Sequence, residues 1–193
     1  MAHEGESDST KRADFQPERF RCYLSILART GLDPRLQPRV GVSDIVQETI
    51  IEAQRDKASF RGTTEEAQAA WMRQILAKNL LNAHRDHHRE MRDVDRDRSL
   101  EGMLENSSCQ LGLWAASIQS SPSARLQQEE RTLKVAEALS SLPDGEIEAV
   151  VLRFIHGWGL AQIGERLQLS RFQVMRRLRE ALARLQIRLE GLQ

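Results

Sequence analysis

The sequence predicts an all-α protein in which two small helical domains are joined by a flexible linker. Apolar residues recur at helical spacing along most of the chain, and no alternating pattern is long enough to predict a strand. A serine-rich stretch separates the two helical parts, and 193 residues are enough for two small domains. We expect a disordered tail at 1–14, a first domain at 15–98, the linker at 99–123 and a second domain at 124–193.

The first domain should contain three helices after the polar tail. Ser43 and Asp44 are good caps for the second helix, and the third runs from about Glu65 to the neighbourhood of Arg85. The apolar faces of the first two helices consist of Phe20, Tyr23, Leu24 and Leu27, and of Ile45, Val46, Ile50 and Ala53. The third helix has an apolar side with Trp71, Met72, Ile75, Leu76, Asn79 and Ala83, and a basic side with Arg73, Gln74, Lys78, Leu81 and Arg85.

The linker is expected from composition, because residues 99–123 hold seven serines, two glycines, one proline and no basic residue after Arg98. Four of its side chains are too apolar to remain in water, so they should dock on another part of the protein. They are Leu111, Leu113, Trp114 and Ile118.

The second domain should end in a helix-turn-helix. The helical pattern resumes after Ala124, and Pro143 interrupts it. Two short amphipathic helices follow, with apolar faces of Leu160, Ile163 and Leu167, and of Val174, Leu178, Leu182, Leu185 and Leu189. Between them, Ser170 and Gln173 can form a capping box, and Leu169 and Val174 stand at the positions of a hydrophobic staple.

The last helix presents a basic face, which favours binding to DNA. Phe172, Arg176 and Arg179 point away from Val174 at about 100° per residue. From residue 170 to 193 six arginines stand against two glutamates, a local charge of +4 in a chain of formal net charge +0. Phosphate neutralisation requires such a concentration of charge. The alternative is an ordinary solvated helix face, which explains the arginines but not the exposed Phe172 or the capped turn.

The sequence gives little support for a metal site, a membrane segment or catalysis. The two cysteines have no ligand spacing, and no apolar run has the length of a signal sequence or a membrane span, so we expect a cytoplasmic protein. His84, His87 and His88 could supply a metal site, with His84 and His88 on one helical face, but no known signature surrounds them. We therefore expect no metal, no cofactor and no catalytic residue.

Four motifs in order resemble the extracytoplasmic-function (ECF, group IV) sigma factors of bacterial RNA polymerase. They are SDIVQETIIEA (43–53), FRG (60–62), AWMRQILAKNL (70–80) and SLPDGEIEAVVLRFIHGWGLAQIGERLQLS (141–170). The resemblance covers 15–189 and implies sigma region 2 and region 4 domains in a promoter-specificity subunit. Its implied partners are core polymerase (the β′ clamp helices and the β flap), promoter DNA and an anti-sigma factor. A plain helix-turn-helix regulator remains the alternative, although it leaves the 43–85 motifs unexplained.

The resemblance also implies three sets of binding residues. The β′ clamp helices would contact Asp44, Gln47, Glu48 and Ile51. The minus-ten element would contact Phe60, Lys78 and Asn82 through bases, and Arg73, Gln74 and Arg85 through phosphates. The minus-thirty-five element would contact Ser170, Arg171, Phe172, Gln173, Arg176 and Arg177 in the major groove. The chain departs from the family pattern at Lys78, Gln168, Phe172 and Gln173, so the family's base preferences do not transfer.

Overall fold

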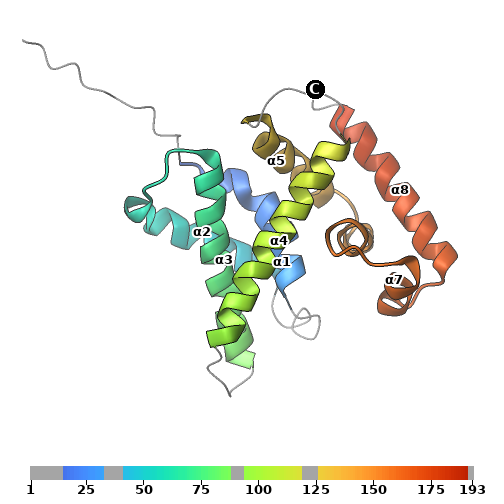
Figure 1. Ribbon diagram of the computed structural model, residues 1–193, viewed down its shortest axis with the longest axis horizontal. Coiled ribbons are helices and arrows are strands. Elements are labelled where there is room, and N and C mark those ends of the chain that lie inside the picture. Colours follow the sequence, from blue (N-terminus) through green and yellow to red (C-terminus); the bar gives the residue numbers. More distant parts are fainter. Residues whose placement is uncertain (1–14, 33–40, 88–93, 119–125, 191–193) are drawn as a thin grey trace, which may run out of the picture.

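The computed structural model describes residues 15–32, 41–87, 94–118 and 126–190, and within them every regular element is helical (Figure 1). The prediction of an all-α fold is therefore confirmed. The expected tail, residues 119–123 of the expected linker and the His88 side chain lie outside the described residues. The elements are η1 (Pro17–Phe20), α1 (Arg21–Gly31), α2 (Val42–Arg55), η2 (Lys57–Ser59), α3 (Glu65–His87), α4 (Val94–Ile118), α5 (Leu126–Ser140), α6 (Asp144–Val150), the π-helical segment η3 (Val151–Ile155), α7 (Leu160–Leu167) and α8 (Arg171–Glu190).

Helix α1 lies at the centre of the first half of the chain and contacts α2, α3, α4 and α5. Tyr23, Leu24, Ile26, Leu27 and Ala28 of this helix are all buried, as a helix with several neighbours requires. The largest side chains that are fully buried around it are Phe20, Leu24, Ile26, Leu27, Ile50, Met72, Leu76, Leu80 and Leu104. Burial of these side chains is the main force that holds the bundle together.

Helix α2 begins earlier than the sequence predicts. Its N-cap is Gly41, so Ser43 and Asp44 lie in the first turn instead of at the cap. A Cβ on Gly41 would lie 2.8 Å from Oδ2 of Asp44, which shows that the Asp44 carboxylate lies over the start of the helix. A carboxylate in the first turn interacts favourably with the helix dipole, which gives Asp44 a local role there.

Residues 99–118, which composition assigned to a linker, instead form most of α4. Leu104, Leu111 and Ala115 are fully buried, and Leu100 and Trp114 nearly so. These apolar residues recur at intervals of three, four and seven, so one face of the helix packs on the bundle. Ser108 is also used in packing, since its Oγ lies 2.7 Å from the Tyr23 hydroxyl. The serine content was therefore misleading. Of the four apolar side chains expected to dock, Leu111 and Trp114 are buried and Ile118 is partly buried, but the expectation was wrong for Leu113, which is 55% exposed.

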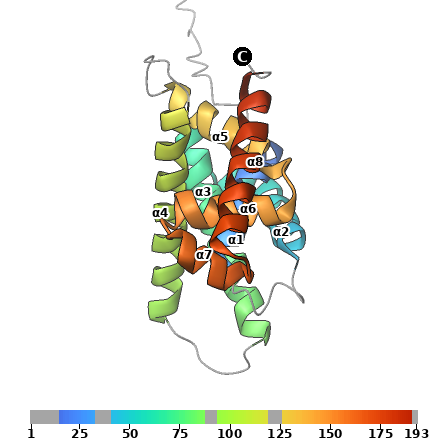
Figure 2. The ribbon, with the colours of Figure 1, turned by 90° about the vertical axis from the view of Figure 1, so that its right-hand side faces the viewer.

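The two halves of the chain share one hydrophobic core. Helix α5 packs on α1 and α4, and η3 packs on α4. The ring of Trp114 stacks on Phe154 of η3, with centroids 5.0 Å apart and an interplanar angle of 13°. An ion pair joins Arg29 of α1 to Asp144 at the start of α6, at 2.8 Å. Figure 2 shows the result, in which α6, α7 and α8 lie against one side of the bundle.

Candidate nucleic-acid interface

The helix-turn-helix consists of α7 and α8, joined by residues 168–170 as the sequence predicts. Gln168 ends α7 with φ 54° and ψ 42°, the left-handed conformation in which glycine is the usual residue. The backbone N–H of Leu169 then donates to the Gly164 carbonyl oxygen at 2.9 Å. The turn is thus closed by the backbone, although the chain has glutamine at the left-handed position.

The capping box at the start of α8 is confirmed. The Gln173 N–H donates to Ser170 Oγ at 3.3 Å, and the Ser170 N–H donates to Gln173 Oε1 at 2.8 Å. Val174 is fully buried and Leu169 is half-buried, as the staple positions require. Because one lone pair of its side-chain oxygen serves the cap, Gln173 keeps its amide NH₂ and one further acceptor position for another partner.

Gly164 of α7 allows the turn to approach the helix closely, a role that the sequence analysis missed. A Cβ at this position would lie 2.6 Å from the backbone oxygen of Leu169. That oxygen belongs to the turn itself, so it cannot move without shifting the entry to α8. The sequence signal that could have revealed this role is a glycine inside a predicted helix, just before the turn that leads to the predicted cap Ser170.

We expect Gly164→Ala to lower the free energy of unfolding by about 1–3 kcal/mol, the usual range for an overpacked site. Gly102→Ala is the matched control, since a Cβ there meets nothing within 4 Å and alanine favours the helix by about 1 kcal/mol. Urea denaturation followed by circular dichroism measures both. Equal stability of the two variants would contradict this account of the turn.

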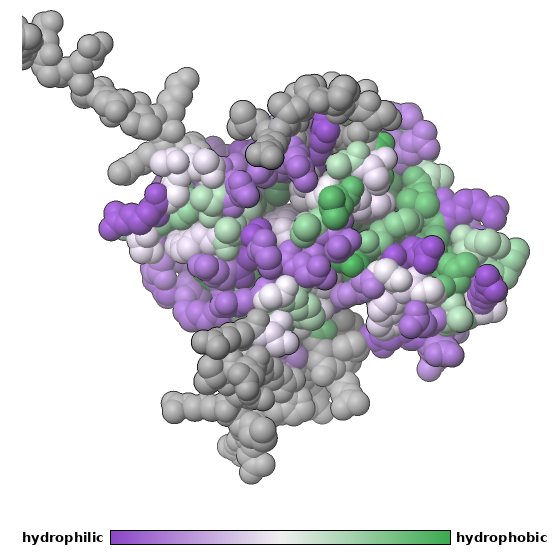
Figure 3. All heavy atoms as spheres, in the orientation of Figure 1, coloured by the Kyte–Doolittle hydropathy of each residue, from purple (hydrophilic) through white to green (hydrophobic). Residues whose placement is uncertain are grey.

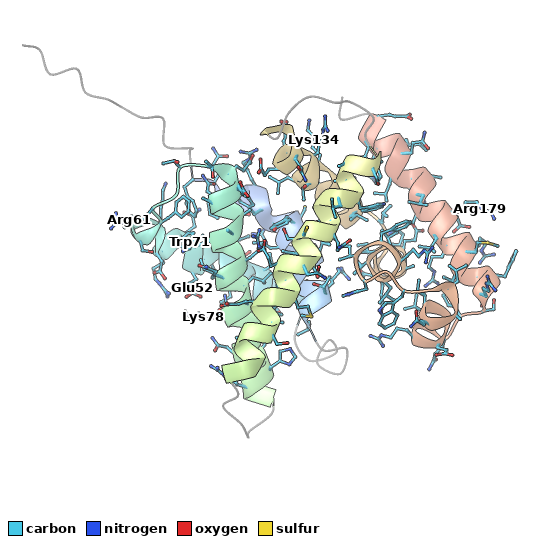
Figure 4. The ribbon with its side chains drawn as sticks, viewed as in Figure 1. Glu52, Arg61, Trp71, Lys78, Lys134 and Arg179 are labelled. Carbon is cyan, nitrogen blue, oxygen red and sulfur yellow. The ribbon has the colours of Figure 1, made fainter. Side chains whose placement is uncertain are left out.

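The outer face of α8 is open to solvent at its N-terminal end. Phe172 is 66% exposed, and Arg171, Gln173 and Arg176 are exposed beside it. Arg179, one turn further along, points away from the protein in Figure 4. Leu182, which the sequence placed on the apolar face, is 37% exposed, and the smaller Ala181 is buried instead. The start of α8 thus presents an aromatic ring among arginines to any partner.

Not every arginine of α8 is available to DNA in this structure. Arg184 donates from Nη1 to the buried carboxylate of Glu146 on α6. Arg177 is half-buried against the same helix, since a Cβ on Gly145 would lie 2.8 Å from its Nη1. These two contacts orient α8 on α6, and they leave Arg171 and Arg176 as the most open cations near the turn.

Residues 138–186 match the family described as sigma-70, region 4. Helix α7 and most of α8 lie within this matched segment. This match supports a DNA-binding protein of the sigma type, or a related regulator, and the matched family is a regulatory domain instead of an enzyme. No curated protein matches the chain. Among the helices of the described residues, none is both long enough and apolar enough to cross a membrane.

Outside region 4, the four residues expected to bind the clamp helices share the outer side of α2. Asp44, Gln47 and Glu48 are exposed, and Ile51 is 56% exposed although it is fully apolar. The opposite side of the helix is buried through Ile45, Val46, Thr49, Ile50 and Ala53. Arg21 of α1 donates to Gln47 Oε1 at 2.8 Å. An apolar side chain held among polar ones on an exposed helix is suited to a protein interface.

Four of the six residues expected at the minus-ten element form an exposed strip on α3. Gln74, Lys78, Asn82 and Arg85 follow one another at intervals of four, four and three, which places them on one side of the helix. Lys78 is paired with Glu52 of α2, and Figure 4 shows the two side chains together. The neighbouring Asn79 is buried and donates to Thr49 Oγ1 at 3.2 Å, so it serves the packing of α3 on α2.

The other two residues of this set lie elsewhere. The ring of Phe60 is half-buried between Phe15 and Trp71, with centroids 5.6 and 5.3 Å away. The side chain of Arg73 is only 14% exposed, because its guanidinium turns inward to Tyr23, at 2.9 Å, and to Glu105. The structure therefore does not bring Phe60 and Arg73 into the exposed strip. Leu81 is also buried, so the basic side of α3 is narrower than expected.

Of the three histidines considered for a metal site, His84 has a structural role, and the side chains of His87 and His88 lie outside the described residues. His84 is buried, and its Nε2 lies 3.3 Å from the Gly31 carbonyl oxygen at the end of α1. No cluster of three possible metal ligands occurs among the described residues. The contact with Gly31 explains why a histidine occupies the side of α3 that packs on α1.

Proposed function

We propose that this protein is an ECF-type sigma factor, a dissociable subunit that directs RNA polymerase to promoters. The observation that carries the proposal is the region 4 helix-turn-helix with its open N-terminal face, in a chain that also has an exposed apolar residue among polar ones on α2. A regulator that binds only DNA would not need the α2 surface. The protein would act in the cytoplasm with promoter DNA, core polymerase and an anti-sigma factor as partners.

In this proposal the two ends of the promoter are bound by different parts of the chain. The start of α8 enters the major groove of the minus-thirty-five element, where Arg171 and Arg176 reach guanine edges or phosphates. The exposed ring of Phe172 is suited to a thymine methyl group, the apolar feature of that groove. The strip of Gln74, Lys78, Asn82 and Arg85 on α3 would hold the single strand of the minus-ten element.

The decisive experiment is transcription with purified core polymerase. The protein should co-elute with core and direct initiation from at least one promoter in a genomic library, measured by sequencing the run-off transcripts. Binding to DNA without co-elution and without initiation would show that the protein is the alternative helix-turn-helix regulator.

The α2 surface can be tested separately. We expect Ile51→Glu to weaken binding to an isolated β′ clamp-helix fragment at least tenfold, because a buried interface position does not accept an unpaired charge. Ile187→Glu is the matched control, since Ile187 is an equally apolar residue, 70% exposed, at the far end of α8. Calorimetric titration measures both affinities. A similar loss in the two variants would argue against α2 as the contact surface.

A further inference from the structure

A groove of about 450 Å³ lies where α1, α3, α4 and α5 meet, remote from the start of α8. Its walls come from the first turns of α3, the second half of α4 and the first half of α5. Figure 1 shows the arrangement of the helices that supply these walls, α3, α4 and α5. Since α5 follows the expected domain boundary, the groove is formed by both halves of the chain together.

The floor of the groove is a satisfied polar network. Arg73 donates from Nη1 to the Tyr23 hydroxyl at 2.9 Å, and the Tyr23 and Ser108 hydroxyls are 2.7 Å apart. Burial raises the pKa of Tyr23, so this hydroxyl stays neutral beside Ser108. Arg73 is also paired with Glu105. The one cation that lines the groove is thus already occupied by groups of the protein.

The walls are acidic. Four glutamates line the groove with the single arginine, which gives the lining residues a formal charge of −3. They are Glu65, Glu66, Glu105 and Glu129. Glu65 is paired with Arg19 at 2.9 Å, whereas Glu66 and Glu129 have no ion pair among the described residues. Two carboxylates therefore remain for an external cation.

Apolar side chains stand beside these carboxylates. Leu113 is 55% exposed on the α4 wall, and Ala69 and Leu133 line the groove next to it. Figure 3 shows hydrophilic residues over this part of the surface, with hydrophobic ones adjoining them towards α8. A site with this composition repels nucleic acid, whose phosphates are negative, and attracts a group that is both cationic and apolar.

We propose that this groove binds a segment of a partner protein in which a lysine or arginine stands next to a leucine-like side chain. The cation pairs with Glu66 and Glu129, and the apolar side chain covers Leu113. Because the groove needs α5 packed on α1 and α4, an occupant stabilises the packed arrangement of the two halves. The proposal rests on the groove alone and does not depend on the sigma assignment.

The test uses the full chain and a fluorescein-labelled octapeptide of alternating leucine and arginine, followed by fluorescence anisotropy. We expect saturable binding that Glu66→Gln/Glu129→Gln weakens at least tenfold. Glu137→Gln/Glu165→Gln removes the same charge from exposed sites outside the groove and should leave the affinity unchanged. No binding at millimolar peptide, or an equal loss in both double variants, would overturn the proposal.

Cys109 gives a second readout of where the peptide binds, because its exposed thiol lies on the rim of the groove. In a Cys22→Ser background, saturating peptide should slow the reaction of Cys109 with a thiol reagent at least fivefold. An unchanged rate in the presence of bound peptide would place the peptide elsewhere and would also overturn the proposal.

Discussion

Trp114→Ala should lower the free energy of unfolding by about 3–5 kcal/mol, the range for removing a large buried aromatic side chain. Trp114 is 8% exposed, and it stacks on Phe154 across the contact between α4 and η3. The substitution leaves a cavity where the two halves of the chain meet, and it removes a ring contact worth about 1 kcal/mol beyond burial. Chemical denaturation monitored by circular dichroism measures the change.

Leu113→Ala is the matched control for this prediction. Leu113 precedes Trp114 on the same helix but is 55% exposed, so its replacement should change stability by about 0.5 kcal/mol or less. The unfolding of the Trp114 variant can also separate into two transitions, because the halves lose part of their common core. Equal midpoints for the two variants would show that the stack does not hold the halves together.

The second large effect concerns DNA. Arg171→Ala/Arg176→Ala should weaken binding to duplex that carries the minus-thirty-five element by at least thirtyfold, since each well-placed arginine contributes about 1–3 kcal/mol. Both side chains are exposed at the start of α8, and Arg176 has only a loose ion pair, at 3.8 Å, with Glu180. The plot of the logarithm of the DNA-binding constant against the logarithm of the salt concentration should also become less steep. The slope should change by about 1.8 if both arginines contact phosphates.

Arg188→Ala is the control for charge alone. It lies twelve residues beyond Arg176, about 18 Å along the helix, and it is exposed. Electrophoretic mobility shifts at several salt concentrations compare the variants, and binding to core polymerase by the double variant should be intact. If Arg188→Ala weakens DNA binding as much as the double variant does, the start of α8 is not the contact surface.

The helix-turn-helix could be predicted because its determinants are local. The Ser170 and Gln173 cap, the buried Val174 and the outward direction of Phe172 all follow from spacing within one or two turns. The exposed side of α2 could be predicted for the same reason. Each of these features depends on a periodic pattern that a helix expresses wherever it lies.

The predictions from sequence were wrong where contacts between residues far apart in the chain determine the structure. Serine content assigned 99–118 to a linker, but the Leu104 and Trp114 face has a partner surface on α1, α5 and η3, and packing outweighs weak helix propensity. Arg73 was placed on the basic side of α3, but Tyr23 and Glu105 attract its guanidinium inward. Tyr23 and Glu105 are both far from Arg73 in the sequence, so no local pattern could predict these contacts.

The sequence by itself therefore determined the helical class, the position and capping of the helix-turn-helix, and the charge on α8. Only the tertiary structure decided which arginines remain open, because Glu146 and Gly145 on α6 engage Arg184 and Arg177. It also decided that the halves share a core and enclose an acidic groove between α3, α4 and α5. The physical reason is that helix periodicity is a property of neighbouring residues, whereas burial and ion pairing depend on side chains that the fold brings together from separate helices.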